Sequence, residues 1–340
     1  RNSASPSRTP RRVPNGACNI RRVMKPMIKY RGGKSKEIPE LLKHIPEFSG
    51  RYVEPFFGGG AMFFYLEPKK AIINDINSRL MNFYRGVRDD YSGLRRELDE
   101  IEALYKENRK SFDALKSMHP YERVEDKNEE MYYALRAMYN GLTDKKYSDA
   151  LLYFYINKTA YSGMIRYNVR GEFNVPFGRY KQLNTSVVTE AHSRLLKNAE
   201  IYSMDYRPVF DKCKENDFVF LDPPYDCVFS DYGNEEYRDG FSESSHRRLA
   251  QDFHNLPCKA LMVIGRTSLT EGLYRGYIVG EYEKNYAVNI RNRFKSTAKH
   301  IIVINYRKLW SLNSDSRSLY RQQEAVDFRL FEATHPYGKN

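Results

Sequence analysis

The chain has 340 residues, of which 41% are hydrophobic, and it carries a formal net charge of +13. That length predicts two domains, or one domain with a large insertion, and the apolar content is sufficient for a real core. The mean hydropathy of −0.71, and the lack of any apolar run near the roughly 18 residues of a membrane span, argue against a membrane protein. No apolar stretch follows the first basic residues, so no signal peptide is expected.

The positive charge is concentrated at the start of the chain. Residues 1–36 contain 11 Arg and Lys and no acid, whereas residues 37–340 contain 45 basic and 43 acidic residues. We therefore expect residues 1–24 to form a basic, disordered arm. Any affinity of the remainder for a polyanion must come from local patches.

The cysteine pattern indicates the cellular compartment of the protein and no metal or disulfide site. None of the four forms a CxxC pair, and no histidine cluster lies near them (Cys18, Cys213, Cys227 and Cys258). We expect neither a zinc site nor a disulfide framework, and a reducing, intracellular location.

In chain order, the first predicted elements open an α/β sheet. Residues 52–65, YVEPFFGGGAMFFY, predict a strand, a glycine turn and an apolar helix, and residues 71–77, AIINDIN, predict a strand that ends in an acid. This succession is typical of a doubly wound sheet. The pattern resumes with strands predicted at 217–225, 259–265 and 299–306.

A different region separates these two parts. Residues 93–150 are dense in charge, with Leu and Tyr at helical spacing, which predicts a helical insertion with solvated outer faces. Residues 151–161 predict a more apolar helix, and residues 165–180 favour a β-hairpin around Arg170-Gly171. Residues 309–340 are polar without clear periodicity, and we expect a tail there.

The glycine turn is the first candidate site. In Phe57-Gly58-Gly59-Gly60 the backbone can approach a ligand that a Cβ would exclude, and Asp75 follows at the end of the next strand, where an acid can bind ribose hydroxyls. The spacing is neither GxGxxG nor GxxxxGK[ST], which disfavours NAD and a phosphate-binding loop. A purely structural turn is the alternative.

A second candidate is the tetrapeptide Asp222-Pro223-Pro224-Tyr225 at a strand end. Two prolines cannot continue a central strand, so they fix the Asp222 carboxylate and the neighbouring carbonyls in a rigid turn. Such acceptors suit an exocyclic amino group, and Tyr225 offers a face for a base. Near the start, residues 29–34, KYRGGK, could wrap an anion, with a flexible basic loop as the alternative.

Taken in order, KYRGGK, VEPFFGGG, NDIN and DPPY resemble the Dam-like adenine-N6 methyltransferases of the alpha group. In that group the target-recognition region lies between the glycine motif and DPPY, and residues 161–181 resemble its DNA-reading segment. The resemblance covers residues 25–308, is strongest at 151–181, and is poor at 93–150 and in both tails.

The resemblance implies an α/β, Rossmann-like methyltransferase sheet with an inserted, mostly helical target-recognition domain that carries a β-hairpin. Its parts would be a catalytic domain at 25–92 and 190–308 and a recognition insertion at 93–189, between the arm 1–24 and the tail 309–340. It implies methyl transfer from S-adenosylmethionine to N6 of a flipped-out adenine in double-stranded DNA, in GATC or a related GAT-containing site. We expect the protein to be a monomer that binds no metal and no membrane. The resemblance is also compatible with a cognate restriction endonuclease as a partner.

Residue roles follow from the same resemblance. The implied catalytic residues are Asp222, Pro223 and Tyr225. The implied cofactor-binding residues are Tyr30, Lys34, Phe57, Gly58, Gly60, Asp75, Asp205 and Asp222. The implied DNA-binding residues are Tyr161, Met164, Arg166, Arg170, Tyr180 and Lys181. Arg166 aligns with an arginine that reads guanine, with a phosphate contact as the alternative, and Arg170 and Lys181 fit phosphate contacts.

This sequence departs from the family pattern at three places. Tyr30 stands where Trp is frequent, Ser162 stands where the family has Asn, and Ile264-Gly265 replaces a polar pair. Cytosine-N4 or RNA-adenine methylation shares the same amine chemistry, and a catalytically dead DNA-binding relative is a further alternative. The Asp before the two prolines favours adenine, and the intact motifs favour an enzyme.

Overall fold

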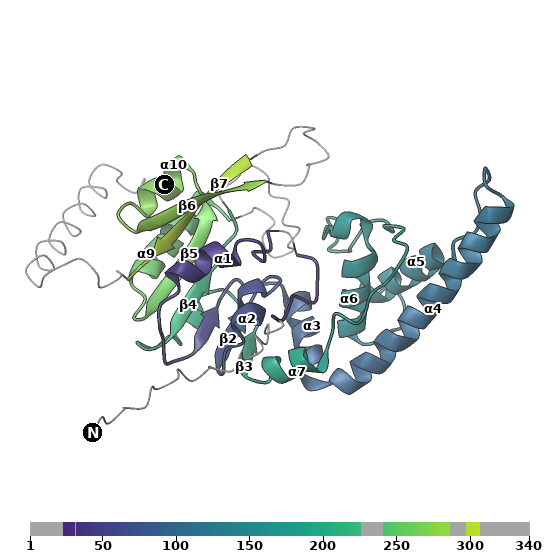
Figure 1. Ribbon diagram of the computed structural model, residues 1–340, viewed down its shortest axis with the longest axis horizontal. Helices are drawn as coiled ribbons and strands as arrows, with labels where there is room; N and C mark the ends of the chain where they lie inside the picture. The colour runs from purple at the N-terminus through teal and green to yellow at the C-terminus, as the bar shows by residue number, and fades with distance from the viewer. Residues whose placement is uncertain (1–22, 31, 226–240, 286–296, 307–340) are drawn as a thin grey trace, which may run out of the picture.

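The computed structural model describes residues 23–30, 32–225, 241–285 and 297–306, so the expected arm up to residue 22 and the tail 309–340 lie outside the described residues. Within this part of the chain, seven strands form one sheet in the order β3-β2-β1-β4-β5-β7-β6 (Figure 1). The strands are β1 (Tyr52–Glu54), β2 (Ala71–Asn74), β3 (Ala199–Tyr202), β4 (Phe218–Leu221), β5 (Lys259–Gly265), β6 (Ile278–Asn285) and β7 (Thr297–Ile304). Strands β1 to β5 pair in parallel, and β7 runs antiparallel to β5 and β6.

The sequence predicted five of these strands and missed two. Each predicted strand is a near-continuous apolar run, as expected for a strand buried on both faces. The missed β3 and β6 are the sheet edges, and they carry exposed acids, Glu200 in β3 and Glu281 and Glu283 in β6. Charged residues are common on edge strands, so no apolar run marks these two.

Helices cover both faces of the sheet. On one face α1 (Ile38–Leu41), α2 (Ala61–Leu66), α3 (Ser78–Asp89) and α7 (Glu190–Leu196) contribute to one apolar cluster. On the other face α8 (Arg207–Phe210), α9 (Glu243–His254) and α10 (Ser268–Leu273) contribute to a second cluster. The arrangement confirms the predicted α/β, Rossmann-like class.

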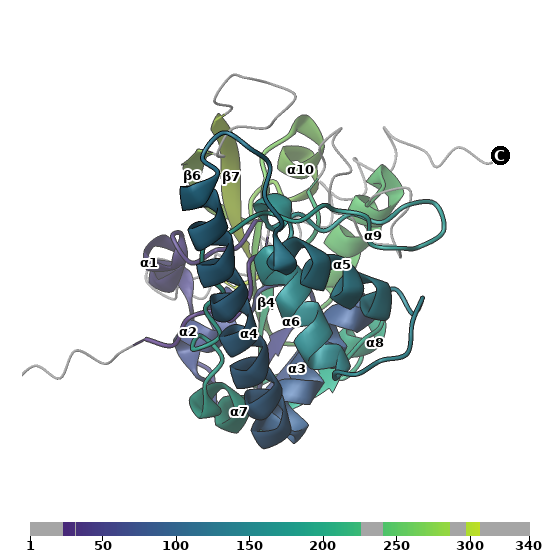
Figure 2. The ribbon, with the colours of Figure 1, turned by 90° about the vertical axis from the view of Figure 1, so that its right-hand side faces the viewer.

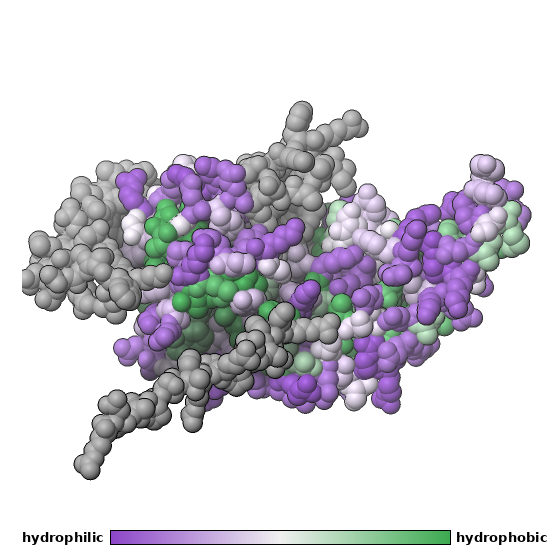
Figure 3. Space-filling view, viewed as in Figure 1, coloured by the Kyte–Doolittle hydropathy of each residue, from purple (hydrophilic) through white to green (hydrophobic). Residues whose placement is uncertain are grey.

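The charged region after α3 is helical, as predicted. It forms α4 (Tyr91–Met118), α5 (Lys127–Tyr139) and α6 (Asp149–Thr159), which lie to one side of the sheet (Figures 1 and 2). The buried residues of α4 all lie between Leu94 and Tyr105, and none lies further along the helix: Leu94, Leu98, Ile101 and Tyr105. Hydrophilic residues accordingly cover most of the outer surface of α4 and α5 in Figure 3. No helix within the described ranges is both long and apolar enough to cross a membrane.

These helices share a core with the sheet instead of forming a separate one. The ring of Phe83 on α3 stacks on Tyr153 and Phe154 of α6, with centroids 5.6 and 6.3 Å apart. A Cβ added at Gly86 of α3 would lie 2.5 Å from Ala150 Cβ, so this glycine lets α3 and α6 approach closely. The close packing of α3 against α6 fixes the insertion relative to the glycine turn, which Tyr84 of α3 contacts.

The predicted hairpin at 165–180 is less regular than expected. The chain turns back at Arg170-Gly171, and the Asn168 N–H donates to the Glu172 carbonyl at 2.9 Å. The antiparallel pairing consists of two isolated bridges, Tyr167 to Phe173 and Ala160 to Phe177, so no extended strands form here.

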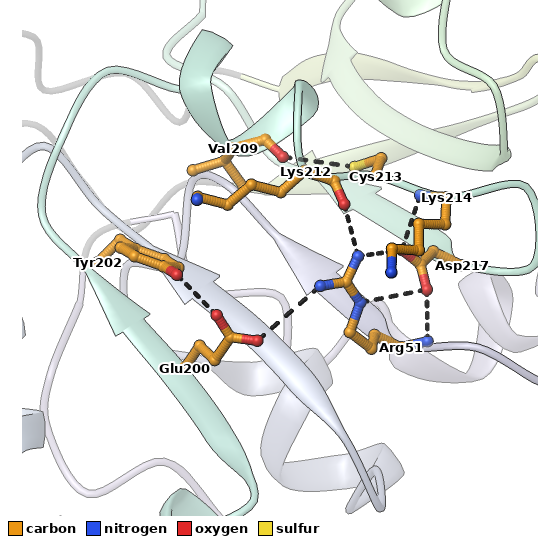
Figure 4. Close-up of polar contacts among 8 residues, drawn as sticks. All are labelled: Arg51, Glu200, Tyr202, Val209, Lys212, Cys213, Lys214 and Asp217. Carbon is orange, nitrogen blue, oxygen red and sulfur yellow. Dashed lines mark hydrogen bonds and ion pairs between the residues drawn. The ribbon is translucent and has the colours of Figure 1, made fainter.

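At the amino ends of the strands, Arg51 joins β1 to β4 (Figure 4). Its backbone N–H and its Nη2 each donate to the Asp217 carboxylate at 2.7 Å, and Lys214 N–H donates to the same group at 2.9 Å. Asp217 is only 3% exposed. Burial by itself raises the pKa of Asp217, but the hydrogen bonds from Arg51 and Lys214 outweigh it and lower the pKa. This ion pair therefore stabilises the amino ends of β1 and β4, at the opposite end of these strands from their chemical motifs.

Candidate active site

The chemistry-bearing motifs meet at the carboxyl edge of the sheet. Strand β1 leads into the glycine turn, β2 is followed by Asp75, and β4 is followed by Asp222. Because β1, β2 and β4 are parallel neighbours, these segments lie at the same edge, where α/β proteins bind ligands. The Asn74 amide holds this edge together, since its Nδ2 donates to the Pro55 and Met204 carbonyls at 3.0 and 2.9 Å.

The glycine turn uses conformations that favour glycine. Gly58 has a φ of 49° and Gly60 a φ of 66°, both in the left-handed region. The Gly58 N–H donates to Asp75 Oδ2 at 2.9 Å, and the Tyr84 hydroxyl donates to the Gly58 carbonyl at 3.0 Å. Asp75 Oδ1 accepts from Asn77 N–H at 3.0 Å, and burial raises the pKa of Asp75. Asp75 therefore also positions the turn, a role that the sequence did not indicate.

Two aromatic rings enclose the turn. A Cβ added at Gly58 would lie 2.7 Å from a ring atom of Tyr30, and one added at Gly59 would lie 3.0 Å from Tyr30 Cβ. Tyr30 thus lies directly against the glycines of the turn. Phe57 lies elsewhere: it is 2% exposed, and its ring centroid is 4.8 Å from that of Tyr84. Phe57 supports the turn from within the core.

The first and last motifs meet in an ion pair. Lys34 Nζ donates to Asp222 Oδ1 and Oδ2 at 2.7 and 2.6 Å and to the Gly32 carbonyl at 2.9 Å. The Tyr225 hydroxyl donates to Asp222 Oδ1 at 3.0 Å, and Lys34 Nζ lies 5.1 Å from the centroid of the Tyr225 ring. The Lys34 side chain is 3% exposed and that of Asp222 is 22% exposed, while Pro223 is buried. The carboxylate is thus held firmly and still reaches the surface.

A further acid near this site was not singled out from the sequence. Glu54, the last residue of β1, is buried and accepts from the Tyr52 hydroxyl at 2.7 Å. Burial raises the pKa of Glu54 well above its usual value, and the nearby Asp222 and Asp75 add to the rise.

Lys29, the first residue of the KYRGGK motif, connects this motif to α6, a contact that the sequence did not predict. Its backbone N–H donates to Asn157 Oδ1 at 2.8 Å, and Asn157 Nδ2 donates to the Lys29 carbonyl at 2.7 Å. Its Nζ lies 3.9 Å from the centroid of the Tyr180 ring, and a Cβ added at Gly163 would lie 2.9 Å from its Cδ. A buried Asn in the otherwise apolar α6 was the available signal.

A second lysine accompanies Lys29. Lys29 Nζ donates to the backbone carbonyl of Lys158 at 3.3 Å, and Lys158 Nζ lies 5.4 Å from the Phe154 ring centroid. Burial, and then the charge of Lys29, lower the pKa of Lys158 to about 8. Two neighbouring cations that repel each other favour an anion beside them.

The DNA-binding residues implied by the resemblance lie on and around the irregular hairpin. Tyr161 is 46% exposed, Arg166 and Lys181 are exposed, and Met164 packs partly against the core. Arg166 Nε donates to Asn174 Oδ1 at 2.8 Å, which orients its guanidinium. The Arg170 side chain is 76% exposed and lies 3.3 Å from the Glu172 carboxylate.

Ser162, one of the departures from the family, has a φ of 54°. Asn adopts this left-handed conformation more readily than Ser, so the substitution strains the turn between Tyr161 and Gly163. Asp205, just beyond β3, accepts from the Arg207 backbone N–H and Nε at 3.0 and 2.8 Å. Its side chain is 37% exposed.

Comparison with known proteins shows the family of the chain. The model of the family described as D12 class N6 adenine-specific DNA methyltransferase matches residues 30–290. The Type II methyltransferase M.CviBI of Paramecium bursaria Chlorella virus NC1A is 34% identical over 291 residues, which cover 83% of this chain and 100% of the relative. The Type II methyltransferase M1.LlaDCHI of Lactococcus lactis subsp. cremoris is 32% identical, covering 83% and 96%. The DNA adenine methylase of Salmonella typhi is 29% identical, covering 79% and 88%.

Proposed function

The chain belongs to the D12 class of N6 adenine-specific DNA methyltransferases, and from this premise we propose that it transfers the methyl group of S-adenosylmethionine to an adenine flipped out of double-stranded DNA. We propose GATC, or a related site that contains GAT, as its target. The observation that carries the proposal is the Lys34–Asp222–Tyr225 group, which lies at the same sheet edge as the glycine turn.

The residues around the turn fit that cofactor. The left-handed glycines expose backbone at a strand end, Tyr30 offers a ring face beside them, and each Asp75 oxygen retains a lone pair beyond its one backbone bond. Asp75 would hold the ribose hydroxyls, and Asp205, half-exposed beyond β3, would bind at the adenine end. S-adenosylmethionine supplies an electrophilic methyl carbon on a sulfonium.

The chain's own residues would bind and orient the target base. Flipping the adenine costs a few kcal/mol, and stacking on Tyr225 recovers part of that cost. Asp222 and the Pro223 carbonyl would accept the two hydrogens of the exocyclic amine, which turns the nitrogen lone pair away from the ring. Lys34 keeps Asp222 in place through two short hydrogen bonds. Catalysis would come from orientation and electrostatics.

The recognition region would be residues 93–189, between the catalytic segments 25–92 and 190–308. Arg166 would read a guanine, and Tyr161 and Met164 would fill the space left by the flipped base. Several cations would bind phosphates or bases near the site, namely Arg170, Lys181, Lys29 and Lys158. The lowered pKa of Lys158 supports the binding of an anion beside Lys29 and Lys158. Tyr180 would contact the outer part of the target site, since its ring packs against Lys29.

Two relatives named Type II methyltransferases support a cognate restriction endonuclease as a partner of this enzyme. We propose that the methyltransferase itself acts as a monomer.

Nucleoside mass spectrometry of unmethylated DNA incubated with the protein and S-adenosylmethionine tests the proposal. We expect N6-methyladenine, and sequencing of the modified sites should return a GAT-containing motif. Asp222→Ala should abolish the product. Asp211→Ala is the control and should retain activity, because Asp211 is an exposed acid that precedes β4 in the chain, whereas Asp222 follows it. N4-methylcytosine, or methylation of RNA alone, would overturn the proposed substrate, and bound cofactor without any product would overturn the proposed activity.

A further inference from the structure

His300 is a buried histidine at the end of the sheet that carries Tyr225. It lies on β7, is 0% exposed, and pairs across the sheet with Gly265 of β5 on one side and Tyr282 of β6 on the other. None of the motifs in the sequence includes it, and it lies 75 positions beyond Tyr225 in the chain. The antiparallel return of β7 beside β5 brings it to the carboxyl edge.

The His300 ring lies between two tyrosines. Its centroid is 5.0 Å from that of Tyr225, with the planes inclined by 52°, and 5.3 Å from that of Tyr282, inclined by 35°. Both distances are within the range in which aromatic pairs attract each other. Three rings from β6, β7 and the segment after β4 therefore form one row.

Gly265 makes room for this row. A Cβ added there would lie 3.7 Å from Cβ, Cγ and Cδ2 of Tyr225, so Tyr225 lies over the backbone of β5 at ordinary contact distance. A larger side chain at this position would extend further toward the tyrosine. Because residue 265 has no side chain, the neighbouring His300 supplies the lateral surface against which Tyr225 packs.

We propose that His300 is a positioning residue, which holds the Tyr225 ring at the angle required to stack on the target adenine. Tyr225 is also held by its hydroxyl bond to Asp222 and by the Lys34 ammonium over its ring. These act at the hydroxyl end and on one face, and His300 limits rotation of the ring about its long axis. The inference rests on the proposed function, because the ring angle matters only if a base stacks on Tyr225.

The test compares two substitutions that both fill the space of the imidazole. His300→Phe keeps an aromatic ring and His300→Leu does not. We expect His300→Phe to retain kcat within about 3-fold and His300→Leu to lose kcat on the order of 10-fold, with KM for S-adenosylmethionine unchanged in both. His254→Leu is the matched control, since His254 also packs on a tyrosine, Tyr277, at 4.4 Å, but on α9; its kcat should stay unchanged.

Fluorescence of DNA with 2-aminopurine at the target position gives a readout that stability does not affect. Emission of the extruded base should be quenched by Tyr225 in the wild type and in His300→Phe, and should rise in His300→Leu. Equal kcat and equal emission for Leu and Phe would overturn the proposal, and so would equal losses in both. Failure of the wild type itself to methylate adenine would instead refute the proposed function.

Discussion

The buried pair between Lys34 and Asp222 gives a prediction with an asymmetry that can be measured. The Lys34 side chain is 3% exposed, whereas that of Asp222 is 22% exposed. Asp222→Ala leaves an almost completely buried ammonium with the Gly32 carbonyl as a remaining acceptor. Lys34→Met leaves a carboxylate that water reaches and that Tyr225 still contacts.

The expected free energies follow from this difference in exposure. Removing one partner of a buried ion pair costs about 3–5 kcal/mol, and we expect about 3 kcal/mol for Asp222→Ala because the pair opens to the surface on the Asp222 side. For Lys34→Met we expect about 1 kcal/mol, the net value of an ordinary hydrogen bond, because water can solvate the exposed part of the Asp222 carboxylate. The double variant has neither charge, so its cost should be about 1–2 kcal/mol, well below the sum.

Urea unfolding of the wild type, the two single variants and the double variant measures the free energy of unfolding directly. Methyl transfer should be lost in both variants that lack Asp222, and Lys34→Met should retain partial activity. Additive losses in the double variant, or a larger loss for Lys34→Met than for Asp222→Ala, would refute the argument from burial.

Three further predictions concern other parts of the molecule. Arg166→Ala should lose about 1–3 kcal/mol of discrimination at one guanine, while Arg170→Ala weakens binding to all sequences alike; competition with single-base variants of the site measures both, and a uniform loss for Arg166→Ala would contradict base reading. Lys158, with its pKa lowered to about 8, should lose its proton as the pH rises through about 8, so DNA affinity should fall there; a titration of Kd against pH checks this, and Lys158→Arg should flatten the curve. The pKa of Asp217 is lowered in the folded state, so its contribution to stability is present above the unfolded pKa near 3.8 and is lost as the pH falls through the lower folded pKa. Asp217→Asn should reduce the free energy of unfolding in urea by about 1–3 kcal/mol at neutral pH and should remove this acid sensitivity. An unchanged dependence of stability on acid pH would contradict the role of the ion pair.

The sequence by itself determined the class of fold and the family. Apolar runs mark β1, β2, β4, β5 and β7 because strands buried on both faces need apolar residues throughout. The glycine turn and DPPY could be recognised because backbone geometry at a strand end restricts which residues are allowed. Charge and helical spacing were enough to predict the helices of the insertion, since these are local properties.

Only the tertiary structure decided how the motifs contact one another. The sequence places Lys34 and Asp222 188 positions apart, and nothing local indicates that the two pair. The same holds for Lys29 with Asn157, and for His300 beside Tyr225. The edge strands β3 and β6 also became apparent only in the fold. Their exposed acids interrupt the apolar pattern that marks the other strands, and they are defined by hydrogen bonds to the neighbouring strands β2 and β7. Local patterns determine the elements of this protein, and packing between distant segments determines the site.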